Sequence, residues 1–163
     1  MRLRSMKSLY IQQKFFKILD HYPITDENGQ TIYQVDQEFN PIGHTVHVSD
    51  PNGNHLFTVD RVVLTLLPKF MVRFANGKEI SIQSNFSLLH RDIDIDPEHL
   101  GLNVMGDFWG HEYTLTQRGN KVGSISKEWL SLTDNYRLDI FDETLQDLFV
   151  AVVIAIDCLL DES

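Results

Sequence analysis

Residues 145–160 read Leu-Gln-Asp-Leu-Phe-Val-Ala-Val-Val-Ile-Ala-Ile-Asp-Cys-Leu-Leu. Nine consecutive positions, Leu148 to Ile156, are apolar, so a helix here offers no face to water and must either span a membrane or be buried in a core. Spanning requires about 20 apolar residues, whereas Asp147 and Asp157 bracket a run of roughly half that length. We therefore predict a buried C-terminal helix over residues 143–160.

The start of this helix carries its own signals. Asp142 or Thr144 can act as the N-cap, because a short polar side chain there accepts a hydrogen bond from an otherwise unpaired amide. Glu143 and Asp147 add negative charge at the positive end of the helix dipole.

A pair of asparagine and glycine recurs along the chain ahead of this helix. The copies are Asn28-Gly29, Asn52-Gly53, Asn76-Gly77 and Gly119-Asn120. Asn-Gly supplies the two positive-φ residues of a type I′ turn, which joins paired antiparallel strands. Each copy therefore predicts a strand, a tight type I′ turn and a second strand.

The residues that follow the turns keep a common register. Apolar residues stand three, six and ten positions after the glycine, as Ile32, Val35 and Phe39, as Leu56, Val59 and Val63, and as Val122, Ile125 and Trp129. A step of three breaks strict alternation, so we expect a β-bulge in each of these strands. The copy after Gly77 instead has apolar residues at Ile80, Ile82 and Phe86, so a strand without a bulge stays open there.

Further alternating segments bring the total to about a dozen strands. A hairpin is expected from residues 91–96, a turn at Pro97-Glu98 and residues 100–108, and one strand each from residues 9–12 and 136–141. So many strands with one buried helix suggest an antiparallel sheet that closes into a barrel around the helix, because a barrel of that size would otherwise be hollow. We predict one mostly β domain over residues 1–163.

Composition limits the possible partners. The 163 residues include 42% hydrophobic and 23% charged ones, which is typical of a globular domain. The net charge of −9 opposes binding to nucleic acid and loose adsorption to anionic membranes. The single Cys158 rules out an internal disulfide framework, and we expect its thiol to pack as a small hydrophobe. Because no unbroken apolar stretch follows the basic N-terminus, we expect a cytoplasmic protein that does not span a membrane.

Several segments together resemble a known family. They are residues 9–14 (Leu-Tyr-Ile-Gln-Gln-Lys), 67–70 (Leu-Pro-Lys-Phe), 106–111 (Gly-Asp-Phe-Trp-Gly-His), 125–129 (Ile-Ser-Lys-Glu-Trp) and 152–157 (Val-Val-Ile-Ala-Ile-Asp), with the Asn-Gly hairpins. The chain resembles the LURP-one-related (LOR) family of the tubby C-terminal-like superfamily. The resemblance implies a twelve-stranded barrel around a central hydrophobic helix. Its superfamily includes tubby domains, which bind phosphoinositides, and phospholipid scramblases.

No local motif predicts catalysis or a cofactor. The chain has no G-x-S-x-G motif and no glycine-rich phosphate loop. Its seven histidines lack the spacing of a metal site; His44 and His47 fall on opposite faces of a strand, and we expect surface histidines. Residues 92–98 begin like a calcium loop, but Pro97 stands where glycine is needed. We therefore expect no cofactor, no metal site and no enzymatic activity.

Three functions remain open. We favour a non-enzymatic binding or scaffold module of the tubby-like class, whose ligand or protein partner is unknown. The first alternative is a phospholipid-headgroup or membrane-surface protein, for which Lys69 and Arg73, on one strand face with Met71 between them, are the candidate binding residues. The second alternative is an enzyme whose site is assembled in space at a barrel mouth.

Overall fold

The computed structural model describes residues 6–12, 20–40, 43–85, 90–96, 99–107, 112–130 and 133–161. The strands that it describes are, in chain order, β1 (Lys7–Gln12), β2 (His21–Asp26), β3 (Thr31–Asn40), β4 (Gly43–Ser49), β5 (His55–Val62), β6 (Lys69–Phe74), β7 (Glu79–Asn85), β8 (His90–Ile95), β9 (Leu102–Asp107), β10 (Glu112–Gln117), β11 (Asn120–Leu130) and β12 (Thr133–Ile140). A 3₁₀ turn, η1 (Glu143–Leu145), leads into the helix α2 (Gln146–Asp161).

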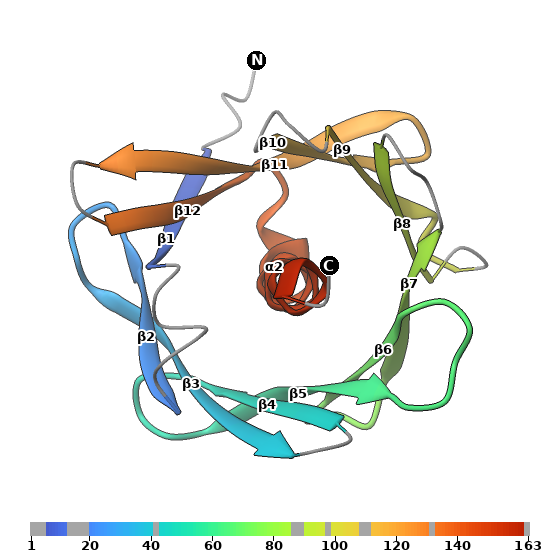
Figure 1. Ribbon diagram of the computed structural model, residues 1–163. Coiled ribbons are helices and arrows are strands. Elements are labelled where there is room, and N and C mark those ends of the chain that lie inside the picture. The colour runs from blue at the N-terminus through green and yellow to red at the C-terminus, as the bar shows by residue number, and fades with distance from the viewer. Residues whose placement is uncertain are drawn as a thin grey trace.

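The strands form one closed antiparallel barrel. Each strand pairs with its neighbour in the chain, and β1 pairs with β12 to complete the ring. Figure 1 looks along the barrel and shows α2 inside the ring of strands. The predicted mostly β fold, a closed antiparallel barrel of about twelve strands with a C-terminal helix, is confirmed.

The helix begins at the predicted cap and is buried on every side. The carboxylate of Asp142 accepts hydrogen bonds from the backbone N–H (3.1 Å) and the hydroxyl (2.6 Å) of Thr144. The first turn is 3₁₀, and the α-helix starts at Gln146. From Leu148 to Asp157, no residue is more than 4% exposed. Each fully buried Val, Leu, Ile or Phe side chain contributes about 1.5–3 kcal/mol, so this segment accounts for a large share of the core.

Polar side chains from the barrel wall hold both ends of the helix. The hydroxyl of Tyr33 donates to Asp147 (2.5 Å) and accepts from the amide of Gln146 (2.8 Å). Near the other end, the hydroxyl of Tyr136 donates to Asp157 (3.1 Å). Burial raises the pKa of Tyr33, and the hydrogen bond to Asp147 raises it further, so Tyr33 stays a neutral donor. Because an apolar helix could otherwise slide along an apolar lumen, these bonds set its axial position.

The predicted type I′ turns are wrong at three of the four positions. Gly29, Gly53 and Gly77 have positive φ, but the asparagines before them do not. In the first copy, the Gly29 N–H donates to the Asp26 carbonyl (3.1 Å) and the Asp26 N–H to the Gln30 carbonyl (2.9 Å). These bonds define a three-residue loop, a type I turn closed by a glycine bulge. The Asp26 carboxylate also accepts a hydrogen bond from the backbone N–H of Gln30 (2.9 Å), which favours this three-residue loop over a two-residue type I′ turn.

The type I′ turn occurs once in the described chain, one residue earlier than predicted. Arg118 (φ 49°) and Gly119 (φ 85°) are its central residues. Gln117 and Asn120 pair across it, so Asn120 already belongs to β11.

The predicted bulges are confirmed, and they fall three residues after the glycine. Ile24 pairs with Tyr33 while Thr25 pairs with Thr31, which leaves Ile32 as the extra residue of β3. Equivalent shifts leave Leu56 extra in β5 and Val122 extra in β11. The β6–β7 ladder, which contains Ile80 and Ile82, has no such shift.

Val63, ten residues after Gly53, lies beyond the end of β5 and is half exposed. The side chains of Phe39, Phe86 and Trp129 lie outside the described residues. Within the described residues, no helix is both long enough and apolar enough to cross a bilayer.

Replacing Val153, which is fully buried near the middle of α2, with aspartate tests the burial of the helix. An uncompensated buried charge costs about 3–5 kcal/mol, so we expect Val153→Asp to lower the melting temperature by about 10 °C or more, or to prevent folding. Leu66→Asp makes the same change at a fully exposed position and should alter the stability by less than about 0.5 kcal/mol. Equal melting temperatures for the two variants would contradict a buried helix.

Gly123 of β11 tests how closely the helix approaches the wall. A Cβ atom there would lie 2.7 Å from the carbonyl oxygen of Asp139 and 2.7 Å from the Phe149 ring of α2. We expect Gly123→Ala to reduce the unfolding free energy by about 1–3 kcal/mol, as overpacking does. At Gly43 a Cβ would make only an ordinary 3.9 Å contact with Val63, so Gly43→Ala is the matched control and should be nearly neutral. Urea unfolding of both variants gives the comparison, and a neutral Gly123→Ala would show that α2 packs less tightly.

Candidate functional site

The barrel has one short seam among its described strand pairs, between β1 and β2. All six residues of β1 pair with β12, but only Leu9 and Tyr10 pair with β2. Continuing the same register would place Gln12 opposite Pro23. Proline has no N–H to donate, so a complete ladder cannot form at this end of the seam.

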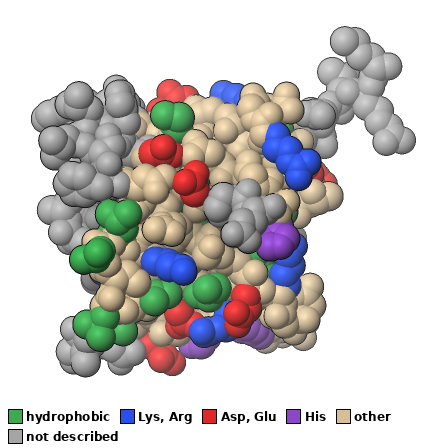
Figure 2. Space-filling model, turned by 90° about the vertical axis from the view of Figure 1, so that its right-hand side faces the viewer, with side chains coloured by type: hydrophobic (Ala, Val, Ile, Leu, Met, Phe, Trp, Pro, Cys, Tyr) green, Lys and Arg blue, Asp and Glu red, His purple; other side chains and the backbone are tan. Residues whose placement is uncertain are grey.

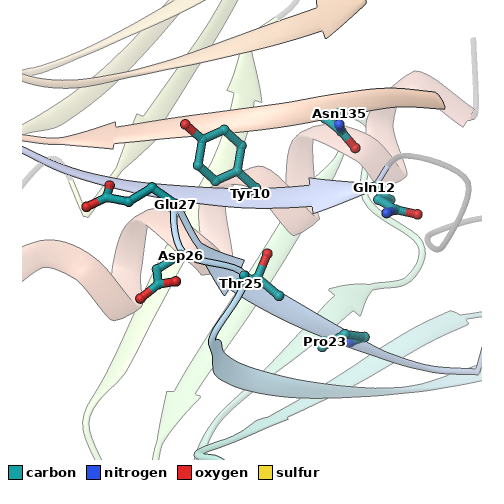
Figure 3. A pocket seen from close by; sticks show the side chains of 8 residues that line it. Tyr10, Gln12, Pro23, Thr25, Asp26, Glu27 and Asn135 are labelled. Carbon is teal, nitrogen blue, oxygen red and sulfur yellow. The ribbon is translucent and has the colours of Figure 1, made fainter. Parts of the chain in front are cut away.

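A pocket of about 400 Å³ lies along this seam. Its lining residues are Tyr10 and Gln12 of β1, Pro23, Thr25 and Asp26 of β2, Glu27 and Gly29 of the following turn, and Asn135 of β12. The alternate residues of β1 and β2, such as Ile11 and Ile24, are buried in the core. The pocket therefore belongs to the outer wall of the barrel (Figure 3).

The pocket is rich in hydrogen-bond acceptors. Asp26 and Glu27 contribute carboxylates, and no Lys or Arg is among the residues that line it. The side-chain oxygen of Asn135 is buried and has no hydrogen-bond partner among the described residues. Figure 3 shows the Tyr10 ring between Glu27 on one side and Asn135 and Gln12 on the other. Acceptors, negative charge and an aromatic face together suit a ligand that carries an ammonium group or several N–H donors.

One carboxylate of the pocket is held in place by the turn. The Asp26 side chain accepts hydrogen bonds from the backbone N–H groups of Asn28 and Gln30, both at 2.9 Å. The loop geometry that the sequence did not predict thus also positions a pocket residue. Sequence reasoning missed this site, although Pro23 within an otherwise alternating strand was an available signal of an incomplete ladder.

Lys69 and Arg73 lie on the outer face of β6 with Met71 between them, but they do not converge on a common point. Four residues along a strand separate them by roughly 13 Å. Arg73 forms ion pairs with Asp60 (2.6 Å) and Glu79 (3.2 Å), so its guanidinium already faces two carboxylates. Neither cation is among the residues that line the pocket at the β1–β2 seam.

An exposed apolar loop precedes Lys69. Between β5 and β6, Leu64 and Leu66 are fully exposed and Val63 is half exposed. Leu64 also has a positive φ of 61°, which is unusual for a branched residue. Figure 2, which views the face over β6 to β8, shows hydrophobic side chains gathered toward one edge beside Lys or Arg side chains. Sequence analysis did not single out this surface.

The histidines of β4 face opposite ways, as predicted. His47 contacts Thr58 on the outside (3.2 Å). His44 points inward and contacts the thiol of Cys158 (2.9 Å), so the expectation of a surface histidine is wrong there. Cys158 is buried, as expected, but it has a polar neighbour that its apolar sequence context does not reveal. Among the described residues, no group of three or more His, Cys, Asp or Glu could hold a metal ion.

Two further sequence features make contacts between neighbouring strands of the barrel wall. Asp92 and Asp94, on the outer face of β8, both accept hydrogen bonds from the Asn103 amide of β9, at 2.6 and 3.0 Å. Gly106 lies against the Tyr113 ring, where a Cβ would come within 2.1 Å of it. Residues 108–111, the rest of the 106–111 segment, and the Pro97-Glu98 turn lie outside the described residues.

A family model and a known protein both match this chain over most of its length. A family model described as LURP-one-related matches residues 7–157. The uncharacterised protein YxjI of Bacillus subtilis (strain 168) is 29% identical over 153 residues, which cover 93% of this chain and 91% of that protein. No solved structure matches the chain.

Proposed function

The chain belongs to the LURP-one-related family, and from this premise we propose that it is a non-enzymatic binding module of the tubby-like class. In this proposal the barrel with its filled axis is a rigid scaffold, and the ligand site is the pocket at the β1–β2 seam. A cytoplasmic location is part of the proposal and suits a chain whose single cysteine leaves it no internal disulfide.

The observation that carries the proposal is the composition of the pocket wall. Two carboxylates, a tyrosine ring and a buried amide oxygen without a hydrogen-bond partner in the described chain all belong to it. A buried acceptor without a donor costs about 1–3 kcal/mol, and a ligand that supplies the donor recovers this free energy. We therefore propose a small polar ligand that carries an amine or quaternary ammonium group.

A second candidate function is binding to a phospholipid headgroup at a membrane surface. The exposed side chains of Leu64 and Leu66, followed by Lys69 and Arg73, favour it, because apolar loop tips beside cations suit an anionic bilayer. The net charge of −9 and the ion pairs of Arg73 with Asp60 and Glu79 count against it.

We expect a thermal-shift panel to separate these candidates. Choline, putrescine, spermidine and glucosamine represent the amine class, and inositol trisphosphate and anionic vesicles represent the headgroup class. A ligand at a hundred times its Kd stabilises by about 2.7 kcal/mol, which should raise the melting temperature by several degrees. We predict that one or more amines produce this shift and that the headgroup probes do not.

Variants locate the binding site. Glu27→Gln should weaken amine binding up to about fivefold, because an exposed ion pair contributes roughly 0.2–1 kcal/mol. Tyr10→Ala should weaken it about tenfold through the lost aromatic face. Met71→Ala, on the outer face of β6, is the matched control and should leave the Kd unchanged. Binding of the headgroup probes alone, abolished by Lys69→Ala, would replace the pocket proposal with the membrane one, and no binding across the panel would contradict both.

A further inference from the structure

Three side chains meet at the C-terminal end of α2. The Cys158 sulfur lies 2.9 Å from Nδ1 of His44 on β4, and Nε2 of the same ring lies 3.0 Å from the side-chain oxygen of Gln37 on β3. Gln37 is buried and His44 is half buried. From Leu148 to Cys158 the exposure is highest at Cys158, at 9%, so the thiol lies where the helix reaches the barrel mouth.

The partners of His44 determine its protonation. The Gln37 oxygen can only accept a hydrogen bond, so Nε2 of His44 must carry the proton. In the neutral ring Nδ1 is then an acceptor, and it faces the Cys158 thiol. A nucleophile, a base within hydrogen-bond reach and a third group that orients the base are the arrangement that activates a weak nucleophile.

Negative charge lies near this pair. Asp157 is adjacent to Cys158 in the chain, both groups are close enough to Tyr22 for their charges to act on it, and the C-terminal end of a helix is electronegative. Such surroundings stabilise the imidazolium that forms when His44 takes the thiol proton. The proton is therefore expected to move from sulfur to imidazole during attack, with His44 as the base.

We propose that Cys158, His44 and Gln37 form an activated thiol site that reacts covalently with soft carbon electrophiles. With iodoacetamide as the probe, the Cys158 sulfur forms the new S–C bond, and iodide leaves with the C–I bonding pair. The thiol proton passes to Nδ1 of His44 and then to solvent. Gln37 is a positioning residue that holds the ring in the required tautomer. This reactivity is independent of the pocket at the β1–β2 seam, whose lining residues do not include these three.

The rate of alkylation at pH 7, followed by mass spectrometry, tests the proposal. Cys158 is the only cysteine of the chain, so each added group reports on it alone. We expect the native chain to react at least tenfold faster than the same chain unfolded in urea, where the thiol has its ordinary reactivity. A native chain that reacts more slowly than the unfolded chain would overturn the proposal, because burial would then dominate.

Variants separate activation from access. His44→Gln should lose at least tenfold in rate while the chain keeps a cooperative thermal transition. His47→Gln changes a histidine on the opposite face of the same strand and should leave the rate unchanged. Gln37→Leu, which removes the acceptor that fixes the ring tautomer, should alter the pH–rate profile of alkylation. An unchanged rate in a folded His44→Gln chain would also contradict the proposal.

Discussion

The burial of an uninterrupted apolar segment, Leu148 to Ile156, is the constraint on which the rest of the structure depends. A helix with no polar face needs apolar neighbours on every side, and a ring of twelve strands needs a filled axis. Each element thus removes the other's exposed apolar surface. The alternation of buried and exposed residues along the strands follows from this arrangement, because one face of every strand is directed at the helix (Figure 1).

A filled axis also determines where ligands can meet the described residues. The wall side chains that face the helix are used for packing, which leaves the outer face of the barrel and its mouths. The outer pocket lies where Pro23 shortens the β1–β2 ladder, and the thiol directly follows Asp157, which ends the uninterrupted apolar run of α2. Both candidate sites therefore occur where the regular packing of the barrel stops.

Much of the fold could be predicted because its signals are local. The apolar run, the Asp142 cap and the step of three at Ile32, Leu56 and Val122 are each contained in a few neighbouring residues. The Asn-Gly pair alone does not indicate a three-residue loop, which in the first two copies is stabilised by the side-chain carboxylate of Asp26 or Asp50. The third copy forms the same loop with Phe74 in that place.

The candidate sites could not be predicted in this way, because they depend on how segments that are far apart in the chain pack together. Tyr10 and Asn135 line one pocket from near opposite ends of the chain, and His44 and Cys158 are 114 residues apart. No local pattern predicts such contacts, and each residue alone is typical of an ordinary surface or core position. For Lys69 and Arg73 the reverse holds: the shared strand face was predictable, but the ion pairs of Arg73 were not.

The central claim is that α2 is an integral part of the barrel core, and native-state hydrogen exchange tests it most directly. The account predicts that amides of Leu148 to Ile156 exchange only through global unfolding, with the same free energy as the slowest amides of β11 and β12. Turn amides such as that of Asn52 should exchange at a much lower free energy. If the α2 amides exchanged more readily than those strands, the helix would open while the barrel stayed intact, and the account would be contradicted.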